Sequence, residues 1–182
     1  WRESLHCNSK YRGRCGEKSS EIMNHNQIRK LIQVKLKYID LWSPEAEELV
    51  FLTGLTESGY DYIRQLGDGP AVSFFQVEPA TAHDVCVNYL KYRATRLQKF
   101  CDATKIPEDA IKTSYKQYWA DMLWYNIAAG ILFCRYKYYR VPEPIPKEIE
   151  GMAAYWKEHY NTAGGKGSVK HFLELAKRRE DR

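Results

Sequence analysis

The amino-acid sequence predicts a mostly α-helical single domain with at most a small β-hairpin near residues 60–75. Apolar residues recur at helical spacing over most of the chain. Capping residues and prolines stand just before these stretches, and clusters of glycine or proline separate them. At 182 residues and 44% hydrophobic content, the chain is long enough to bury one sizeable core.

The first two helices are defined by their apolar spacing and by their ends. Isoleucines and leucines at helical spacing predict a first helix over residues 26–40. A second helix is predicted to start after Ser43, a good N-cap, with Pro44 at the first helical position. Its apolar stripe runs to Glu57, and Gly59 is the expected terminator. The Glu57 carboxylate is therefore expected on the apolar face, at the C-terminal end of its helix.

The remainder of the sequence predicts six more helices, which makes about eight in all. Turn-forming residues predict a loop or short hairpin around residues 65–70, and a second glycine loop precedes the last helix. Residues 1–22 are polar and have no period, so we interpret them as an N-terminal extension or arm before a domain at 23–182. The six further helices are expected at 78–101, from Pro107, and at 115–125, 126–139, 147–160 and 169–178, the last capped by Ser168.

Composition narrows the classes of function. The net charge of +5 is modest, and no helix-turn-helix or RNA-binding aromatic pattern accompanies it, so no specific nucleic-acid partner is expected. No apolar run approaches the roughly 20 residues that span a bilayer, which predicts no transmembrane segment. The N-terminus has no apolar stretch typical of a secretory signal, so no signal peptide is expected.

The five cysteines include no C-x-x-C pair. The spacing of Cys7 and Cys15 does not favour a zinc site, and we expect buried, reduced thiols instead. No metal and no organic cofactor are expected.

Glu57 is the candidate for proton-transfer chemistry. A glutamate on an apolar helix face loses hydration, which raises its pKa, and the carbonyl end of a helix acts in the same direction. Such a group can hold a proton near neutral pH and donate it to a glycosidic oxygen. From the pattern alone, the alternative of a helix-end glutamate turned to solvent remains open.

Four sequence motifs, in order, resemble the catalytic domain of the soluble lytic transglycosylases, which are relatives of goose-type lysozyme. The family pattern is E-S, then G-L-M-Q-x-M-P-x-T-A, then N-x-x-A-G-x-x-Y-L, then A-Y-N-A-G. The first is "ES" at Glu57–Ser58, and the second is "VSFFQVEPATA" at 72–82. The third is "NIAAGILFCRYKYY" at 126–139, and the fourth is "AAYWKEHYNTAGGKG" at 153–167. The resemblance implies a lysozyme-like α+β fold, mostly α.

The resemblance also implies an activity. A single glutamate, here Glu57, acts as acid and then as base on the β-1,4 bond between N-acetylmuramic acid and N-acetylglucosamine in peptidoglycan. The muramoyl 6-hydroxyl attacks intramolecularly and leaves a 1,6-anhydro end. The residues implied to bind the substrate or to support Glu57 are Ser58, Ser73, Gln76, Tyr160 and Asn161.

The chain departs from the family pattern within the second motif. Glu78 stands where the family has methionine, Ser73 replaces a glycine, and Phe74–Phe75 replace Leu–Met. Glu78 and Asp68 are therefore possible second carboxylates, with Asp68 in a Gly-Asp-Gly turn where it could position a water. Either one could make the enzyme a hydrolytic muramidase on the same fold.

The residues found in these motifs resemble the motif variants of bacteriophage virion proteins. The resemblance therefore implies peptidoglycan glycan strands as the partner, with other phage tail or ejection proteins as further partners. It also implies a virion protein acting in the host periplasm or cell wall during entry. The remaining alternative is a non-catalytic virion structural or ejection protein that retains the fold.

Overall fold

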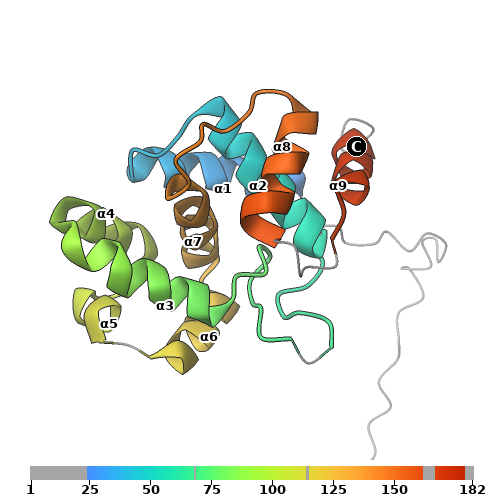
Figure 1. The fold of residues 1–182 in the computed structure, drawn as a ribbon. Coiled ribbons are helices and arrows are strands. Elements are labelled where there is room, and N and C mark those ends of the chain that lie inside the picture. Colours follow the sequence, from blue (N-terminus) through green and yellow to red (C-terminus); the bar gives the residue numbers. More distant parts are fainter. Residues whose placement is uncertain (1–23, 68, 114, 162–166, 179–182) are drawn as a thin grey trace, which may run out of the picture.

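The structure is a computed structural model that describes residues 24–67, 69–113, 115–161 and 167–178. Within these residues the chain forms nine α-helices, a 3-10 turn at Leu90–Tyr92 and a π-helical turn at Lys157–Asn161. The predicted mostly helical fold is confirmed (Figure 1). The predicted N-terminal arm lies outside the described residues. The helices are α1 (His25–Tyr38), α2 (Pro44–Ser58), α3 (Pro79–Asn88), α4 (Ala94–Thr104), α5 (Glu108–Thr113), α6 (Lys116–Tyr125), α7 (Ile127–Tyr139), α8 (Ile149–Trp156) and α9 (Val169–Arg178).

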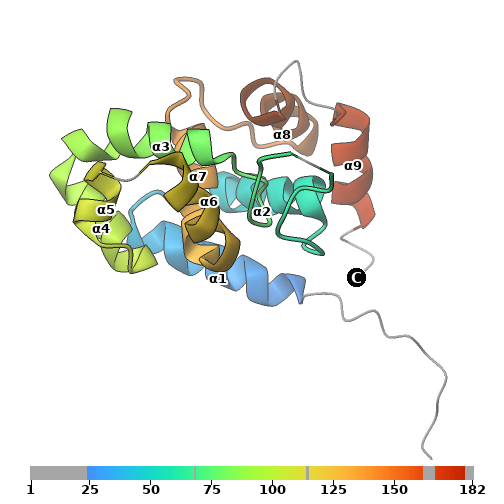
Figure 2. The same cartoon turned by 90° about the horizontal axis from the view of Figure 1, so that it is seen from below.

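Helix α7 is the centre of the molecule. Its residues from Ala129 to Tyr136 are all buried, and it packs against α1, α2, α3, α4 and α6. Helices α3 to α6 lie on one side of α7, and α2, α8 and α9 lie on the other (Figures 1 and 2). One continuous hydrophobic core connects both sides. The loop between α2 and α3 runs between the two groups of helices (Figure 1).

Helix α2 begins and ends where the sequence predicts. The Ser43 hydroxyl accepts a hydrogen bond from the Ala46 N–H at 3.0 Å, and Pro44 takes the first helical position. Gly59 closes the helix in the left-handed conformation, with φ 64°, and its N–H donates to the Leu55 carbonyl. Glu57 therefore lies in the last turn of α2.

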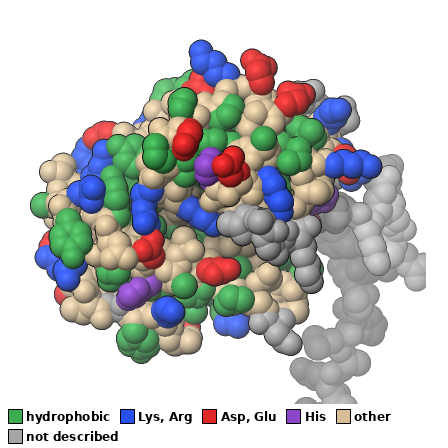
Figure 3. Space-filling model, in the orientation of Figure 1, with side chains coloured by type: hydrophobic (Ala, Val, Ile, Leu, Met, Phe, Trp, Pro, Cys, Tyr) green, Lys and Arg blue, Asp and Glu red, His purple; other side chains and the backbone are tan. Residues whose placement is uncertain are grey.

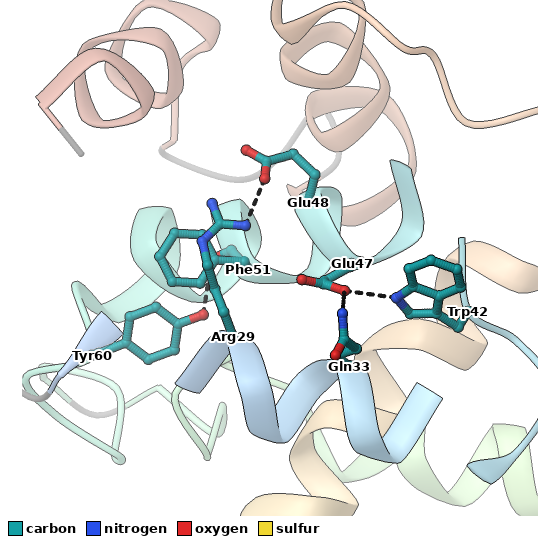
Figure 4. A network of polar contacts seen from close by, with 7 residues as sticks. All are labelled: Arg29, Gln33, Trp42, Glu47, Glu48, Phe51 and Tyr60. Carbon is teal, nitrogen blue, oxygen red and sulfur yellow. Dashed lines mark hydrogen bonds and ion pairs between the residues drawn. The ribbon is translucent and has the colours of Figure 1, made fainter. Parts of the chain in front are cut away.

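A set of polar contacts fixes α1 against the first half of α2 (Figure 4). The Arg29 guanidinium contacts Glu48 at 2.7 Å. One carboxylate oxygen of Glu47 accepts hydrogen bonds from Gln33 at 3.1 Å and from the Trp42 indole at 2.6 Å. These side chains come from α1, α2 and the connection between them, so they fix the direction in which α2 runs.

The loop after α2 is held by its own side chains and by α7. Tyr60 folds back on α2, where its hydroxyl donates to the Phe51 carbonyl at 2.9 Å (Figure 4). Of the two expected forms, loop or short hairpin, the structure has a loop with two isolated bridges, Arg64 with Val72 and Val72 with Val77. Ser73 has a positive φ of 71°, and a Cβ on Gly130 of α7 would lie 2.9 Å from its side chain. Glycine at 130 therefore lets this loop lie directly on α7.

The predicted helix over 78–101 is wrong in one respect, because it is two α-helices. The chain turns at Tyr89 (φ −130°, ψ −64°) and again at Arg93 (φ −135°, ψ 77°), with buried Leu90 between them. Helix α3 packs mainly on α6 and α7, whereas α4 packs on α7 and α1, so a straight helix could not reach both. This break explains why the described ranges hold nine α-helices where about eight were expected.

Two further expectations concern the C-terminal part of the chain. The helix predicted over 147–160 is α-helical only to Trp156 and continues as the π-helical turn. Ser168 caps α9 as predicted, because its hydroxyl accepts from the His171 N–H at 3.2 Å. None of the described helices is both long and apolar enough to cross a membrane.

The described cysteines are free thiols. Cys86 and Cys134 are buried, and burial raises the pKa of both, that of Cys134 to about 12. Within the described residues no three His, Cys, Asp or Glu side chains are grouped to hold a metal ion. Cys7 and Cys15 lie outside the described residues.

Candidate active site

A pocket of about 570 Å³ opens at the C-terminal end of α2, where segments far apart in the sequence meet. Its walls come from the end of α2, the loop segments 65–66 and 71–78, the start of α3, the last turn of α7, and the end of α8 with the π-helical turn. The described residues that line it are Thr56, Glu57, Gln65, Leu66, Ala71, Gln76, Val77, Glu78, Thr81, Lys137, Trp156, Tyr160, Asn161 and Gly167.

Glu57 lies in this pocket as a partly buried carboxylate with a fixed orientation. The indole N–H of Trp156 donates to its Oε1 at 2.9 Å, and the Tyr62 hydroxyl donates to its backbone carbonyl at 2.8 Å. Burial raises the pKa of Glu57 above its ordinary value. The Trp156 hydrogen bond, the Lys137 charge and a hydrogen bond from Asn161 oppose this rise but do not cancel it. The solvent-exposed alternative for Glu57 is therefore wrong.

Gln76 lines the pocket, and its amide has a fixed orientation. Its Nε2 donates to the Ser73 carbonyl at 2.8 Å and to the Ile63 carbonyl at 3.4 Å, which fixes the orientation of the amide. Its Oε1 is buried and has no partner among the described residues, and the same is true of the Thr56 hydroxyl. Buried polar atoms without partners are uncommon, and these two belong to residues that line the pocket.

Tyr160 and Asn161 line the pocket as predicted, but the Tyr160 hydroxyl does not face it. That hydroxyl donates to the Phe75 carbonyl at 2.7 Å, and the ring stacks on Tyr138 with centroids 5.2 Å apart. The side-chain oxygen of Asn161 accepts from the Lys157 amine at 2.8 Å. Tyr160 thus fixes the π-helical turn to the second motif, while the Asn161 amide reaches Glu57.

Ser58 and Ser73 do not line the pocket, which corrects the expectation that they bind substrate. They are only 3% and 2% exposed. The Ser58 hydroxyl donates to the Phe74 carbonyl at 2.7 Å, and the Ser73 hydroxyl accepts from the Phe75 N–H at 3.2 Å. Both hydroxyls satisfy buried backbone groups, so their role is to hold the loop against the end of α2.

Of the possible second carboxylates, Glu78 shares the pocket with Glu57. It is exposed, stands at the N-cap of α3 and makes no capping hydrogen bond. Asp61, an exposed carboxylate just after α2, lines a different pocket together with Trp124. Asp68 lies outside the described residues.

Lys137 and Trp156 are site residues that the sequence analysis did not identify. The Lys137 amine donates to the Tyr160 carbonyl at 2.7 Å and lines the pocket. Burial lowers its pKa, and the charges of Glu57 and Glu78 act against that change. A lysine inside an otherwise buried helix was the available signal for Lys137. For Trp156 the sequence offers no local signal, because an apolar helix end is an ordinary place for a tryptophan.

All four sequence motifs meet at this pocket. The first and fourth supply Glu57 and Asn161, the second supplies Gln76, and the third supplies Lys137. Comparisons with protein-family models, with curated proteins and with solved structures found no match for this chain.

Proposed function

We propose that the protein is a lytic transglycosylase of the lysozyme-like kind that cleaves the β-1,4 bond between N-acetylmuramic acid and N-acetylglucosamine in peptidoglycan. The observation that carries this proposal is the Glu57 carboxylate, held at 2.9 Å by the Trp156 indole inside a polar pocket. A carboxyl group whose pKa is raised by burial keeps its proton closer to neutral pH, as a general acid requires.

The chemistry uses one carboxyl group twice. Glu57 gives its proton to the glycosidic oxygen as the bond from that oxygen to C1 of the muramoyl sugar breaks. The 6-hydroxyl oxygen of the same sugar then bonds to C1, and its proton passes to Glu57. Between the two steps Glu57 is an anion, and the Trp156 N–H and the Lys137 ammonium stabilise that charge.

The unsatisfied atoms of the pocket agree with a sugar ligand. Because both N–H groups of Gln76 are used by backbone carbonyls, its Oε1 can only accept a hydrogen bond. An acetamido N–H or a sugar hydroxyl is a suitable donor. The Thr56 hydroxyl can accept or donate, so it adds a second contact beside Glu57.

The biological setting is part of the proposal. The motif variants resemble those of bacteriophage virion proteins, so the protein would open the host wall locally during entry, with phage tail or ejection proteins as partners. Wall cleavage does not depend on this setting and can be tested separately.

A hydrolytic muramidase is the second candidate, and Glu78 favours it. Glu78 lies in the same pocket as Glu57 and carries no capping hydrogen bond, so its carboxylate is free to hold a water molecule. Water attack would leave a reducing end instead of a 1,6-anhydro end. The end groups of the released fragments distinguish the two routes.

Clearing of purified peptidoglycan tests whether the protein is an enzyme at all. Glu57→Gln keeps the size of the side chain and removes the proton, so the rate should fall about 10²- to 10⁴-fold, the usual contribution of a general acid. Glu45→Gln, at the other end of the same helix, is the matched control and should retain the wild-type rate. If wild type and Glu57→Gln clear walls equally well, the protein is a non-catalytic structural protein and the proposal fails.

A further inference from the structure

Lys137 is a cation in the Glu57 pocket that forms no ion pair within the described part of the chain. Among the described residues that line the pocket, it alone is basic. It is half-buried in the last turn of α7, and no described carboxylate lies within 4.0 Å of its amine. Charged side chains that lose contact with water are normally paired, so this ammonium favours an anion supplied by a bound ligand.

The Lys137 amine is held in place but keeps donors for a ligand. It donates to the Tyr160 carbonyl at 2.7 Å and lies 4.2 Å from the centroid of the Tyr160 ring. An ammonium group has three N–H donors, and this carbonyl takes one of them. The position of the cation is therefore fixed before any ligand binds, while further N–H donors remain for it.

The two carboxyl groups of the pocket do not neutralise Lys137 by direct contact. The charges of Glu57 and Glu78 favour the protonated amine, but neither forms an ion pair with it. One carboxylate oxygen of Glu57 accepts from the Trp156 indole at 2.9 Å instead. In the acid form that the proposed reaction requires, Glu57 is neutral, so Lys137 then has one anion fewer near it.

A peptidoglycan strand offers one anionic group close to the cleaved bond. Its hydroxyl and acetamido groups are neutral. The muramoyl sugar carries a lactyl ether on C3, which ends in a carboxylate when no stem peptide is attached and in a neutral amide when one is. Because Glu57 must reach the glycosidic oxygen on C1 of this sugar, the lactyl group is held close to the pocket that Lys137 lines.

We propose that Lys137 binds the lactyl carboxylate of the muramoyl sugar and thereby makes the protein selective for strands without stem peptides. The identity of this ligand rests on the proposed function, because that function places the muramoyl sugar in the pocket. An ammonium group binds a carboxylate more strongly than an amide carbonyl, since the hydrogen bond is then charge-assisted from both sides. A stem peptide replaces the carboxylate with an amide and removes this advantage.

A nucleic acid fits the site less well than a single carboxylate does. Lys and Arg side chains are interspersed with Asp and Glu side chains over the face shown in Figure 3. The described lining of the pocket itself combines one basic residue with two acidic ones. A chain of phosphates requires several cations in succession, whereas one carboxylate requires only one.

Binding of soluble glycan strands to Glu57→Gln protein tests this proposal without any cleavage. Two fluorescent probes are prepared from amidase-treated strands: one keeps its free lactyl carboxylates, and the other is coupled to methylamine, which turns each carboxylate into a neutral amide. In fluorescence anisotropy the carboxylate strands should bind about fivefold to tenfold more tightly, the difference between a charge-assisted and a neutral hydrogen bond. Adding Lys137→Met should remove this difference by weakening binding of the carboxylate strands alone.

Lys35→Met, also in Glu57→Gln protein, separates a local contact from general attraction between charges. The Lys35 amine likewise donates to a backbone carbonyl, that of Ala103, at 2.7 Å, but Lys35 does not line the pocket. This variant should keep the preference for carboxylate strands. Strands that still carry stem peptides should bind equally well with and without Lys137→Met. Unfolding midpoints confirm that each variant is folded.

The outcomes are separable from the fate of the proposed function. Equal affinity of the Glu57→Gln protein for the two probes, or no binding of either, overturns the proposal without any substitution of Lys137. So does an equal loss on both probes in Lys137→Met, which would leave the lysine only its structural contact with Tyr160, or a lost preference in Lys35→Met. Wall cleavage by the wild-type protein without a preference for carboxylate strands keeps the proposed function and removes this inference, and a preference without cleavage does the reverse.

Discussion

The two ends of helix α2 place glutamates in opposite environments. At the N-terminal end, hydrogen bonds from its own backbone N–H and from Ser43 lower the pKa of Glu45. Glu47 next to it is held by Gln33 and Trp42. An anion at this end is favoured by the free N–H groups and by the helix dipole.

At the C-terminal end of α2 the pKa of the glutamate is shifted in the opposite direction. Burial raises the pKa of Glu57, and the helix terminus offers carbonyl groups instead of N–H donors. The Trp156 indole supplies a donor from another part of the chain, 99 residues away. Thr56 beside it has a buried hydroxyl without a partner in the described residues.

The difference gives one helix two kinds of carboxylate, with pKa values shifted in opposite directions. Carboxylates at its start are satisfied by nearby groups and fix the helix to α1. The carboxylate at its end is only partly compensated, so its pKa is raised and it holds a proton to higher pH than an ordinary glutamate does. Substitutions that change the surroundings of either glutamate test this difference, and the largest effect is expected at Trp156.

Trp156→Phe removes the hydrogen bond from the indole N–H to the Glu57 carboxylate at the C-terminal end of α2. Wall cleavage should fall about tenfold to a hundredfold, because a charge-assisted hydrogen bond to the ionised Glu57 is lost. The pKa of Glu57 should rise further, which moves the alkaline limb of the pH–rate profile to higher pH. The measurement is initial clearing rate against pH.

Trp119→Phe is the control for the packing change. Trp119 is also fully buried, and its indole N–H has no partner among the described residues. It should lose stability comparably but keep cleavage within about twofold, since it does not line the pocket. Equal losses of activity in the two variants would assign the effect of Trp156 to packing alone.

Lys137→Met tests whether the positive charge of Lys137 lowers the pKa of Glu57. Removing this cation raises the pKa of Glu57, so the alkaline limb should again move to higher pH, while the optimum rate falls by no more than about tenfold. Lys35→Met is the control, because its amine also donates to a backbone carbonyl, that of Ala103, at 2.7 Å. A pH profile that does not move in Lys137→Met contradicts the assigned role.

The smallest expected effects are on stability. Glu→Gln substitutions at the two ends of α2 should change the free energy of unfolding in opposite directions. Because the pKa of Glu57 is raised on folding, its favourable contribution is complete below its unfolded pKa and is lost as the pH rises through its folded pKa. Glu57→Gln should therefore increase the free energy of unfolding at neutral pH, by about 0.5–2 kcal/mol, and the gain should disappear in acid.

Glu45→Gln should do the opposite in the same urea titrations. Its pKa is lowered on folding, so its contribution is present above the unfolded pKa and is lost as the pH falls through the folded pKa. The variant should be less stable than wild type at neutral pH and equal to it in strong acid. If Glu45→Gln and Glu57→Gln change the free energy of unfolding in the same direction, the proposed difference between the two ends of α2 is wrong.

The parts of the fold that local rules govern were predictable from the sequence. The N-cap at Ser43, the left-handed Gly59 and the cap of α9 at Ser168 each depend on residues within one helical turn. The position of Glu57 follows from the apolar stripe of α2. The break at residues 89–93 was missed, because it depends on what α3 and α4 pack against.

The candidate site was predictable from the sequence only for residues whose motif position alone indicates a role. Glu57 and Gln76 were identified through motif spacing, and both line the pocket. The buried roles of Ser58 and Ser73 depend on how the loop 71–77 lies against α7, with positive φ at Ser73 and Gln76. Trp156 meets Glu57 only through the tertiary fold, so no local pattern indicates it.

The end groups of the fragments released from purified peptidoglycan test the central claim most directly. If Glu57 is the single acid and base, mass spectrometry of the wild-type digest should find 1,6-anhydromuramoyl ends, and Glu78→Gln should leave that result unchanged. Reducing ends in the wild-type digest, lost together with activity in Glu78→Gln, would contradict the transglycosylase route and establish a hydrolase with two carboxylates.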